Sequence, residues 1–127
     1  MQLLPHYEKA VISIEKLRNY VLDPNHRAGK HKARVFKAAL GIESVHSDAF
    51  AQLLKSSLGR SPAVRGLKDR HGERWTTYNE IIGLNGRSRV VTVAWIYRSE
   101  REDVPVLITC YLEPQGARKL AEALNAD

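Results

Sequence analysis

The sequence contains a single cysteine, Cys110, which excludes an intrachain disulfide framework and a cysteine-based zinc site. Because Cys110 lies in the apolar run VPVLITCYL, we expect it to be a small buried residue. No apolar run approaches the ~18 residues of a membrane span. The segment MQLLPHYEKAVISIEK also lacks a basic region followed by a long apolar stretch and a small-residue cleavage site, so we expect a cytoplasmic protein.

The motifs of several enzyme classes are also missing. The sequence has no glycine-rich nucleotide-binding loop, no nucleophile elbow and no metal-ligand spacing, and its Asp, Glu and His residues do not form a metal-binding set. We therefore expect no cofactor and no metal, and a small-molecule enzyme has little support. The 127 residues contain no repeat, low-complexity segment or linker, which predicts a single domain over residues 1–127.

Basic residues, in contrast, are abundant. Twenty Lys and Arg residues against fourteen Asp and Glu residues give a net charge of +6 and a pI near 9.7, which favours a polyanionic partner such as nucleic acid or an acidic protein. Residues 26–37 hold seven Lys, Arg or His residues and no acid. Several of these cations fall where a helix should begin, and a helix N-terminus disfavours positive charge. A bound phosphate would relieve that repulsion.

Hydrophobic spacing predicts three N-terminal helices. The first covers residues 8–22, has Val11 on its apolar face and ends before Pro24. The second covers residues 30–40, with a glycine after its last turn. The third begins with Ser47 as its N-cap and runs to about residue 58.

Four β-rich segments follow the helices, over residues 63–69, 73–83, 88–98 and 104–114. The turn-rich pieces RHG and LNGR between them predict hairpins, so the sheet should be mainly antiparallel. A short last helix is expected over residues 115–125. The predicted fold is therefore an α+β domain: three N-terminal helices packed on a four-stranded, mainly antiparallel sheet, with a short C-terminal helix.

Two of the strands, residues 88–97 and 104–112, are apolar on both faces, which predicts that both are central in the sheet. Helices that back one face of the sheet would leave the other face free to bind a ligand. Thr92, Thr109 and Tyr111 are the polar residues in these apolar strands that suit such a surface.

Helical spacing separates the cations of the second helix. Lys30, Arg34 and Lys37 lie on one stripe, which is most simply a solvated face. Lys32 precedes Val35 by three residues and so lies on the apolar face, where it either extends to solvent along its stem or points at the edge of the sheet. His26, in the loop before the helix, is placed to form an anion site with the free amides of the helix start.

The run DPNHRAGKHKARVF, residues 23–36, resembles the signature N/D-P-x-H-x-x-G-x-x-K-A-R-x-F of an uncharacterised bacterial domain family associated with toxins. The preceding KLRNYVL and the strand pieces TVAW and LITCY are similar to other parts of that family, except for the extra alanine before Trp95. The family's layout resembles the metal-independent ribonuclease superfamily of barnase, colicin D and RelE.

The resemblance implies an RNA-cleaving toxin with a possible antitoxin or immunity protein as partner, and it leaves two site pairs open. The domain family points to His26 and Lys32, whereas the similarity to colicin D points to Lys30 and His31.

The leading hypothesis is a metal-independent endoribonuclease that cleaves tRNA or mRNA by attack of the 2′-hydroxyl group. In it His26 transfers protons, and Lys32 and Arg34 stabilise the phosphorane. The remaining candidates contact the substrate: hydroxyl groups of Thr92, Thr109 and Tyr111, the basic residues Lys30 and His31, and Trp95 as a stacking partner for a base. The alternative is a non-catalytic basic module that binds RNA or an acidic, antitoxin-like or immunity-like protein.

Overall fold

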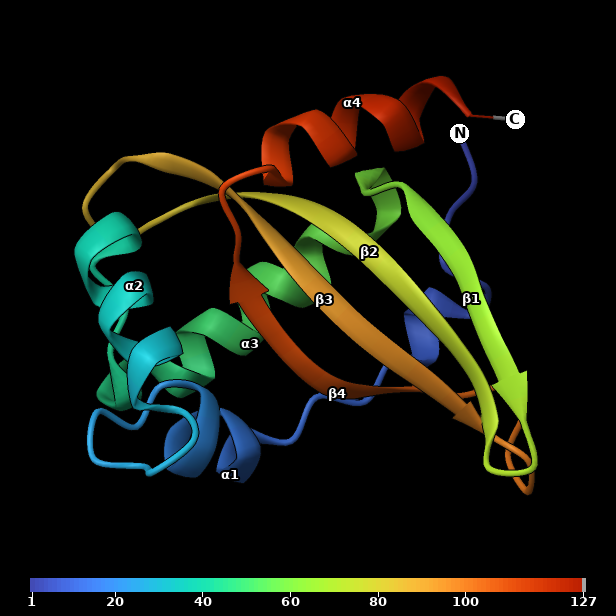
Figure 1. The fold of residues 1–127 in the computed structure, drawn as a ribbon, viewed down its shortest axis with the longest axis horizontal. Helices are drawn as coiled ribbons and strands as arrows, with labels where there is room; N and C mark the ends of the chain where they lie inside the picture. Colours follow the sequence, from blue (N-terminus) through green and yellow to red (C-terminus); the bar gives the residue numbers. More distant parts are fainter. Residues whose placement is uncertain (127) are drawn as a thin grey trace.

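In a computed structural model, which describes residues 1–126, the chain forms a four-stranded antiparallel sheet flanked by helices (Figure 1). The strands follow one another in the sheet in chain order, and each neighbouring pair is antiparallel. Their bounds are β1 Ala63–Asp69, β2 Gly72–Ile82, β3 Ser88–Arg98 and β4 Pro105–Leu112. The predicted α+β class and its antiparallel sheet are therefore confirmed.

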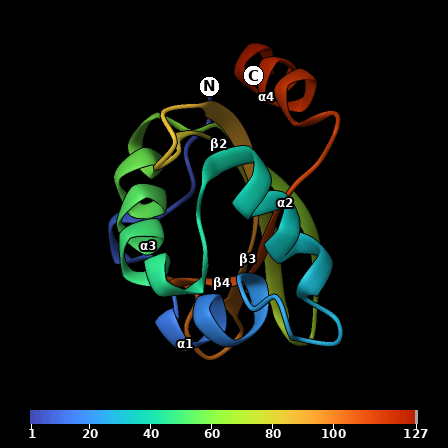
Figure 2. The same ribbon diagram turned by 90° about the vertical axis from the view of Figure 1, so that its left-hand side faces the viewer.

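The helices lie around this sheet on more than one side. Figure 2 shows α3 on one side of the sheet and α4 on the other, and α2 packs against β4. None of the helices in residues 1–126 is long and apolar enough to span a membrane. The α-helices are α1 Ile14–Lys16, α2 Lys30–Leu40, α3 Ser47–Ser57 and α4 Gly116–Asn125, and the short 3-10 and π turns are Tyr7–Lys9, Leu17–Val21, Ser44–His46 and Leu58–Arg60.

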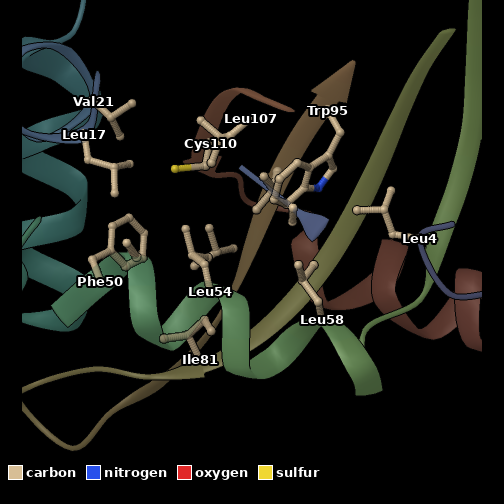
Figure 3. Packing of buried hydrophobic residues seen from close by; sticks show 14 of the residues in the cluster. Leu4, Leu17, Val21, Phe50, Leu54, Leu58, Ile81, Trp95, Leu107 and Cys110 are labelled. Carbon is tan, nitrogen blue, oxygen red and sulfur yellow. The ribbon is translucent and has the colours of Figure 1, made fainter. Parts of the chain in front are cut away.

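The hydrophobic core fills the space between α3 and one face of the sheet (Figure 3). Phe50 and Leu54 of α3 are fully buried against the sheet, which contributes Trp95 and Cys110 among others. Each fully buried large apolar side chain stabilises the fold by roughly 1.5–3 kcal/mol. The alternation along β3 places Val91, Val93 and Trp95 on this core face, and Thr92 on the opposite, outer face.

The predicted N-terminal helix over residues 8–22 is wrong in its first half. Residues 7–9 form a single 3-10 turn, and the chain is then extended, with Val11 in a parallel bridge to Val106 of β4. The helical part begins at Ile14, because the Ser13 side chain accepts a hydrogen bond from the Lys16 amide and caps it. Local spacing could not reveal that Val11 pairs with a strand almost a hundred residues away.

The prediction that both apolar strands are central is confirmed for β3 and wrong for β4. β4 lies at the edge of the sheet. Its apolar character has another cause: α2 packs against it, and the segment around Val11 exchanges backbone hydrogen bonds with Pro105 and Leu107. A covered edge strand is as shielded from water as a central one, and the sequence pattern does not distinguish the two.

The turns and helix ends follow the sequence more closely. The predicted hairpins connect β1 to β2 after Asp69 and β2 to β3 at Gly86, whose positive φ of 80° suits glycine. Gly41 ends α2 in the left-handed conformation, as predicted. Ser47, in contrast, is the first residue of α3 and not its N-cap, because a 3-10 turn leads directly into the helix and the Ser47 hydroxyl donates to the Ser44 carbonyl.

Candidate functional site

The side chain of Lys32 lies half-buried between α2 and the outer face of the sheet. Its Nζ donates a hydrogen bond to Thr109 Oγ1 of β4 at 3.2 Å and another to Tyr20 Oη at 3.1 Å. The ring of Tyr111, two residues along β4, has its centroid 5.9 Å from the same nitrogen, within cation–π range. Of the two options that the sequence left for Lys32, the structure shows the one directed at the sheet.

Tyr20 joins the lysine to His26. Its ring meets the His26 imidazole edge to face, with centroids 4.8 Å apart and an interplanar angle of 74°. Tyr20 belongs to the π-helical turn Leu17–Val21, which is closed by the hydrogen bond from the Leu22 amide to the Leu17 carbonyl. We call Tyr20, His26, Lys32, Thr109 and Tyr111 the Lys32 cluster. Sequence analysis quoted Tyr20 within KLRNYVL but assigned it no role.

Gly29 allows the loop before α2 to approach Tyr20 this closely. A Cβ atom at position 29 would lie 2.1 Å from the Tyr20 carbonyl oxygen and 3.2 Å from the Tyr20 ring. Only glycine fits there without a shift of the backbone. The glycine of the signature therefore holds the loop against the π-helical turn.

The His26 side chain is bonded to the loop that precedes α2. Its Nδ1 accepts hydrogen bonds from the amides of Ala28 and Gly29, each at 3.0 Å. An acceptor nitrogen carries no hydrogen, so the ring proton of this tautomer sits on Nε2. These two amides precede the helix, and the helix start at Gly29 has no side-chain cap hydrogen bond. This geometry supports a positioning role more directly than proton transfer.

Lys32 has no counter-ion among the residues that the structure describes. No carboxylate oxygen of residues 1–126 lies within the 4.0 Å ion-pair limit of its Nζ. An ammonium group has three N–H donors, and the hydroxyl groups of Tyr20 and Thr109 accept two of them. A half-buried cation with only neutral partners is incompletely compensated, and a bound anion would complete it.

A second polar cluster lies farther along the same face of the sheet. Thr92, which pairs across the strands with Tyr111, donates from Oγ1 to Glu113 Oε2 at 2.7 Å, and Lys119 of α4 donates to Glu113 Oε1 at 2.5 Å. Burial raises the pKa of Glu113, but the hydrogen bonds from Lys119 and Thr92 outweigh it and bring the pKa below its usual value. Glu113 is therefore ionised at neutral pH and is held in place by two hydrogen bonds. Sequence analysis missed it because an acid directly after a strand carries no motif.

The structure does not bring the other predicted residues into the Lys32 cluster. Arg34 follows Lys32 by two positions, which turns it to the opposite side of α2, where it lines a small cavity with Leu22 and Glu43. Lys30 is exposed at the start of the helix. His31 is exposed as well and lines a groove that also contains Glu113.

Trp95 cannot take the expected role of a stacking partner, because it lies on the core face of the sheet. It is fully buried, and its Nε1–H donates to Thr77 Oγ1 at 2.9 Å. The alternation of β3 places it opposite Thr92, and the core covers its ring (Figure 3). Thr92 lies on the expected face, but it is 1% exposed and already bonded to Glu113.

Residues 3–114 match the model of a family described as a domain of unknown function, DUF6883. The chain belongs to this family. No curated protein matches the DUF6883 chain.

The fold is also similar to a solved structure. One chain of a contact-dependent growth inhibition toxin–immunity protein complex from Klebsiella pneumoniae 342 matches with a TM-score of 0.56 and 14% identity, over 85% of this chain and 97% of that one. At this identity the match shows a shared fold and nothing more.

Proposed function

We propose that this protein is toxin-like and cleaves RNA without a metal ion, with the Lys32 cluster holding the reacting phosphate group. The observation that carries the proposal is the half-buried ammonium group of Lys32, which has hydroxyl and aromatic neighbours and, within residues 1–126, no carboxylate partner. The fold shared with a chain of a toxin–immunity complex supports the toxin-like part of the proposal. The net charge of +6 suits a polyanionic substrate.

In the proposed reaction the 2′-oxygen of the RNA attacks phosphorus, and the bond from phosphorus to the 5′-oxygen breaks. The products are a 2′,3′-cyclic phosphate end and a 5′-hydroxyl end. Lys32 stabilises the charge that grows on the phosphorane oxygens, and Thr109 holds the lysine in place through its hydroxyl group.

Two protons must move in this reaction, one from the 2′-hydroxyl group and one to the 5′-oxygen. We assign the first transfer to His31, which precedes Lys32 on α2 and whose imidazole is exposed. We assign the second to Tyr20, whose oxygen accepts from Lys32 and so keeps its own proton available for donation. The pair that acts at the phosphate thus takes Lys32 from one resemblance and His31 from the other.

The direct test is cleavage of total RNA or tRNA in the presence of EDTA, followed on a gel with analysis of the product ends. We expect cleavage, and we expect Lys32→Met to reduce it by at least about 100-fold, because the stem is kept and the charge is lost. Lys55→Met is the matched control, since Lys55 is an exposed lysine on α3. Equal rates for the two variants would remove Lys32 from the site.

The role of His26 has its own test. The Oδ1 atom of asparagine occupies the same place along the side chain as Nδ1 of histidine, so His26→Asn preserves the acceptor for the Ala28 and Gly29 amides. We expect this variant to keep most of the cleavage rate, whereas His26→Ala loses it together with the loop geometry. Loss in both variants would restore proton transfer to His26.

The non-catalytic alternative uses the same charges without an acid and a base. The exposed stripe of Lys30, Arg34 and Lys37 favours it, because these cations can attract RNA or an acidic protein without any contact with Lys32. RNA that is bound but stays intact in EDTA would support this alternative. So would host growth that is unaffected by expression of the protein.

A further inference from the structure

A groove of about 700 Å³ lies between α2 and the start of α4, next to the Lys32 cluster. One of its walls is Val35 and Ala39 of α2, and another is Gly116 and Ala117 of α4. Val90, against which Gly116 packs, forms part of its floor. Val35 is 36% exposed, unusually open for an apolar residue on the packed side of a helix. These residues give the groove small or aliphatic walls that are accessible from solvent.

Five polar or charged residues line the groove: His31, Glu80, Ser88, Arg89 and Glu113. Glu113 lines it, and each of its carboxylate oxygens already accepts one hydrogen bond, from Thr92 and from Lys119. A carboxylate has about four acceptor sites, so both oxygens keep one that is free for a ligand. His31 lines the groove as well, beside Lys32 in the sequence. The groove therefore offers the acceptors of Glu113 and Glu80, and the donors of Arg89 and Ser88, beside its apolar walls.

The groove adjoins the Lys32 cluster through sequence neighbours, since His31 precedes Lys32 and Leu112 follows Tyr111. Thr109, Tyr111 and Glu113 follow one another at alternate positions from β4 onward, with Lys32 bonded to the first and Thr92 to the last. At about 3.3 Å per residue the two ends of this row lie about 13 Å apart. A short stretch of single-stranded RNA spans that distance, with a phosphate at Lys32 and a base in the groove.

We propose that this groove is a nucleobase pocket that selects guanine, with Glu113 as the group that reads the base edge. The proposal rests on the proposed function, because the phosphate of the same RNA is placed at Lys32. Proteins read unpaired bases through hydrogen bonds to their Watson–Crick edges. Guanine presents two adjacent N–H donors there, at N1 and N2, and these match the two oxygens of a carboxylate. Adenine and cytosine present one amino group each, and uracil presents a single N–H between two carbonyl oxygens, which a carboxylate repels.

The test uses nucleoside 3′-monophosphates, which bind without being cleaved, and ribose phosphate, which has no base. We expect guanosine 3′-monophosphate to bind at least 10-fold more tightly than uridine 3′-monophosphate and ribose phosphate, measured by calorimetry. Glu113→Gln should remove the preference for guanine, because the amide replaces one acceptor by a donor. Val35→Trp should fill the groove and reduce every nucleotide to the affinity of ribose phosphate.

Val45→Trp is the matched control, since Val45 is 81% exposed and lies outside the groove. Should Glu113→Gln lower the stability, Val35→Trp keeps the test decisive, because it changes an accessible helix surface. Equal affinities for the four nucleotides and ribose phosphate, with binding still dependent on Lys32, would overturn the pocket and leave the proposed function standing. A guanine preference without RNA cleavage would support the pocket and contradict the proposed catalysis. If no nucleotide binds at all, both proposals fail.

Discussion

The polar side chains on the two faces of the sheet differ in how completely they are hydrogen-bonded and in charge. On the core face, Trp95 donates to Thr77, Thr77 to Asn79, Asn79 to Ser57, and Ser57 to the Leu54 carbonyl, at distances of 2.7 to 2.9 Å. This chain of bonds is neutral, fully buried and closed, since every donor finds an acceptor in the protein. On the outer face, Lys32 is charged, half-buried and held only by neutral groups.

This difference separates a structural polar network from a binding one. A buried network that is complete adds specificity to the core and has nothing to offer a ligand. Within residues 1–126, no buried side-chain nitrogen or oxygen lacks a partner. Unlike the exposed cations of α2, Lys32 combines a half-buried position with neutral hydrogen-bond partners, and a group of that kind is a candidate site for an anion.

The largest effect on stability is expected when the core network is broken. Asn79→Leu removes the partner of both Thr77 and Ser57, so we expect the free energy of unfolding to fall by about 3 kcal/mol in urea titrations. Lys32→Met, in the other network, should change it by less than about 1 kcal/mol, because both hydroxyl groups it leaves lie near solvent. If Lys32→Met lowers the free energy of unfolding more than Asn79→Leu does, the outer face and not the core network is the more important for stability.

A smaller effect on stability but a clear one on the site is expected at Gly29. Gly29→Ala places a methyl group against the Tyr20 carbonyl, so the loop and the π-helical turn must separate. We expect a loss of about 2 kcal/mol in unfolding free energy and a decrease in Lys32-dependent RNA cleavage. Gly86→Ala is a suitable control, because nothing lies within 4 Å of a Cβ atom there, although its positive φ carries a modest strain of its own. If Gly29→Ala retains full cleavage, the close approach is not needed by the site.

The ion pair on the outer face gives a weaker effect that depends on pH. The pKa of Glu113 is lower in the folded protein than its usual value of 4.5. The ionised side chain therefore stabilises the fold fully above pH 4.5, and this stabilisation is lost as the pH falls through the folded pKa. The stability difference between the wild type and Glu113→Gln should thus be constant from pH 6 to 8 and shrink below about pH 4.5 in thermal melts. A difference that grows on acidification would contradict the ion pair.

The smallest effect is expected in the thiol reactivity of Cys110, which follows Thr109 in β4 but faces the core. Burial raises the pKa of the Cys110 thiol to about 12, and the nearby Lys32 lowers it only in part. We expect no measurable reaction with a thiol reagent at pH 8 in the folded protein and rapid reaction in urea. Rapid labelling of the folded protein would show that the two faces are not separated at β4.

The parts of the fold that the sequence predicts are those decided by local chemistry. The hairpins, the end of α2 at Gly41 and the place of Lys32 on the apolar face of α2 follow from turn residues and helical spacing, whereas the direction of the lysine stem was left open. The pairing of Val11 with β4 and the edge position of β4 depend on contacts between distant segments. No local pattern contains that information.

The candidate site divides in the same way. The signature identified Lys32 and His26, but the tautomer of His26 is set by the Ala28 and Gly29 amides, which only the folded loop brings together. Tyr20 and Glu113 escaped notice because a tyrosine in a helix and an acid after a strand are common. Trp95 was misplaced because its role depends on which face of β3 the helices cover.

The cations of α2 differ in how far they are buried. Lys30, Arg34 and Lys37 stand in solvent, where mobile ions weaken their attraction beyond about 8 Å at physiological ionic strength. Lys32 acts at contact and from a half-buried position, where such screening is weak. A polyanion would therefore be drawn in by the outer stripe at low salt, and its encounter rate would fall steeply as salt is added. The attraction that remains at high salt would come from direct contact with Lys32 alone.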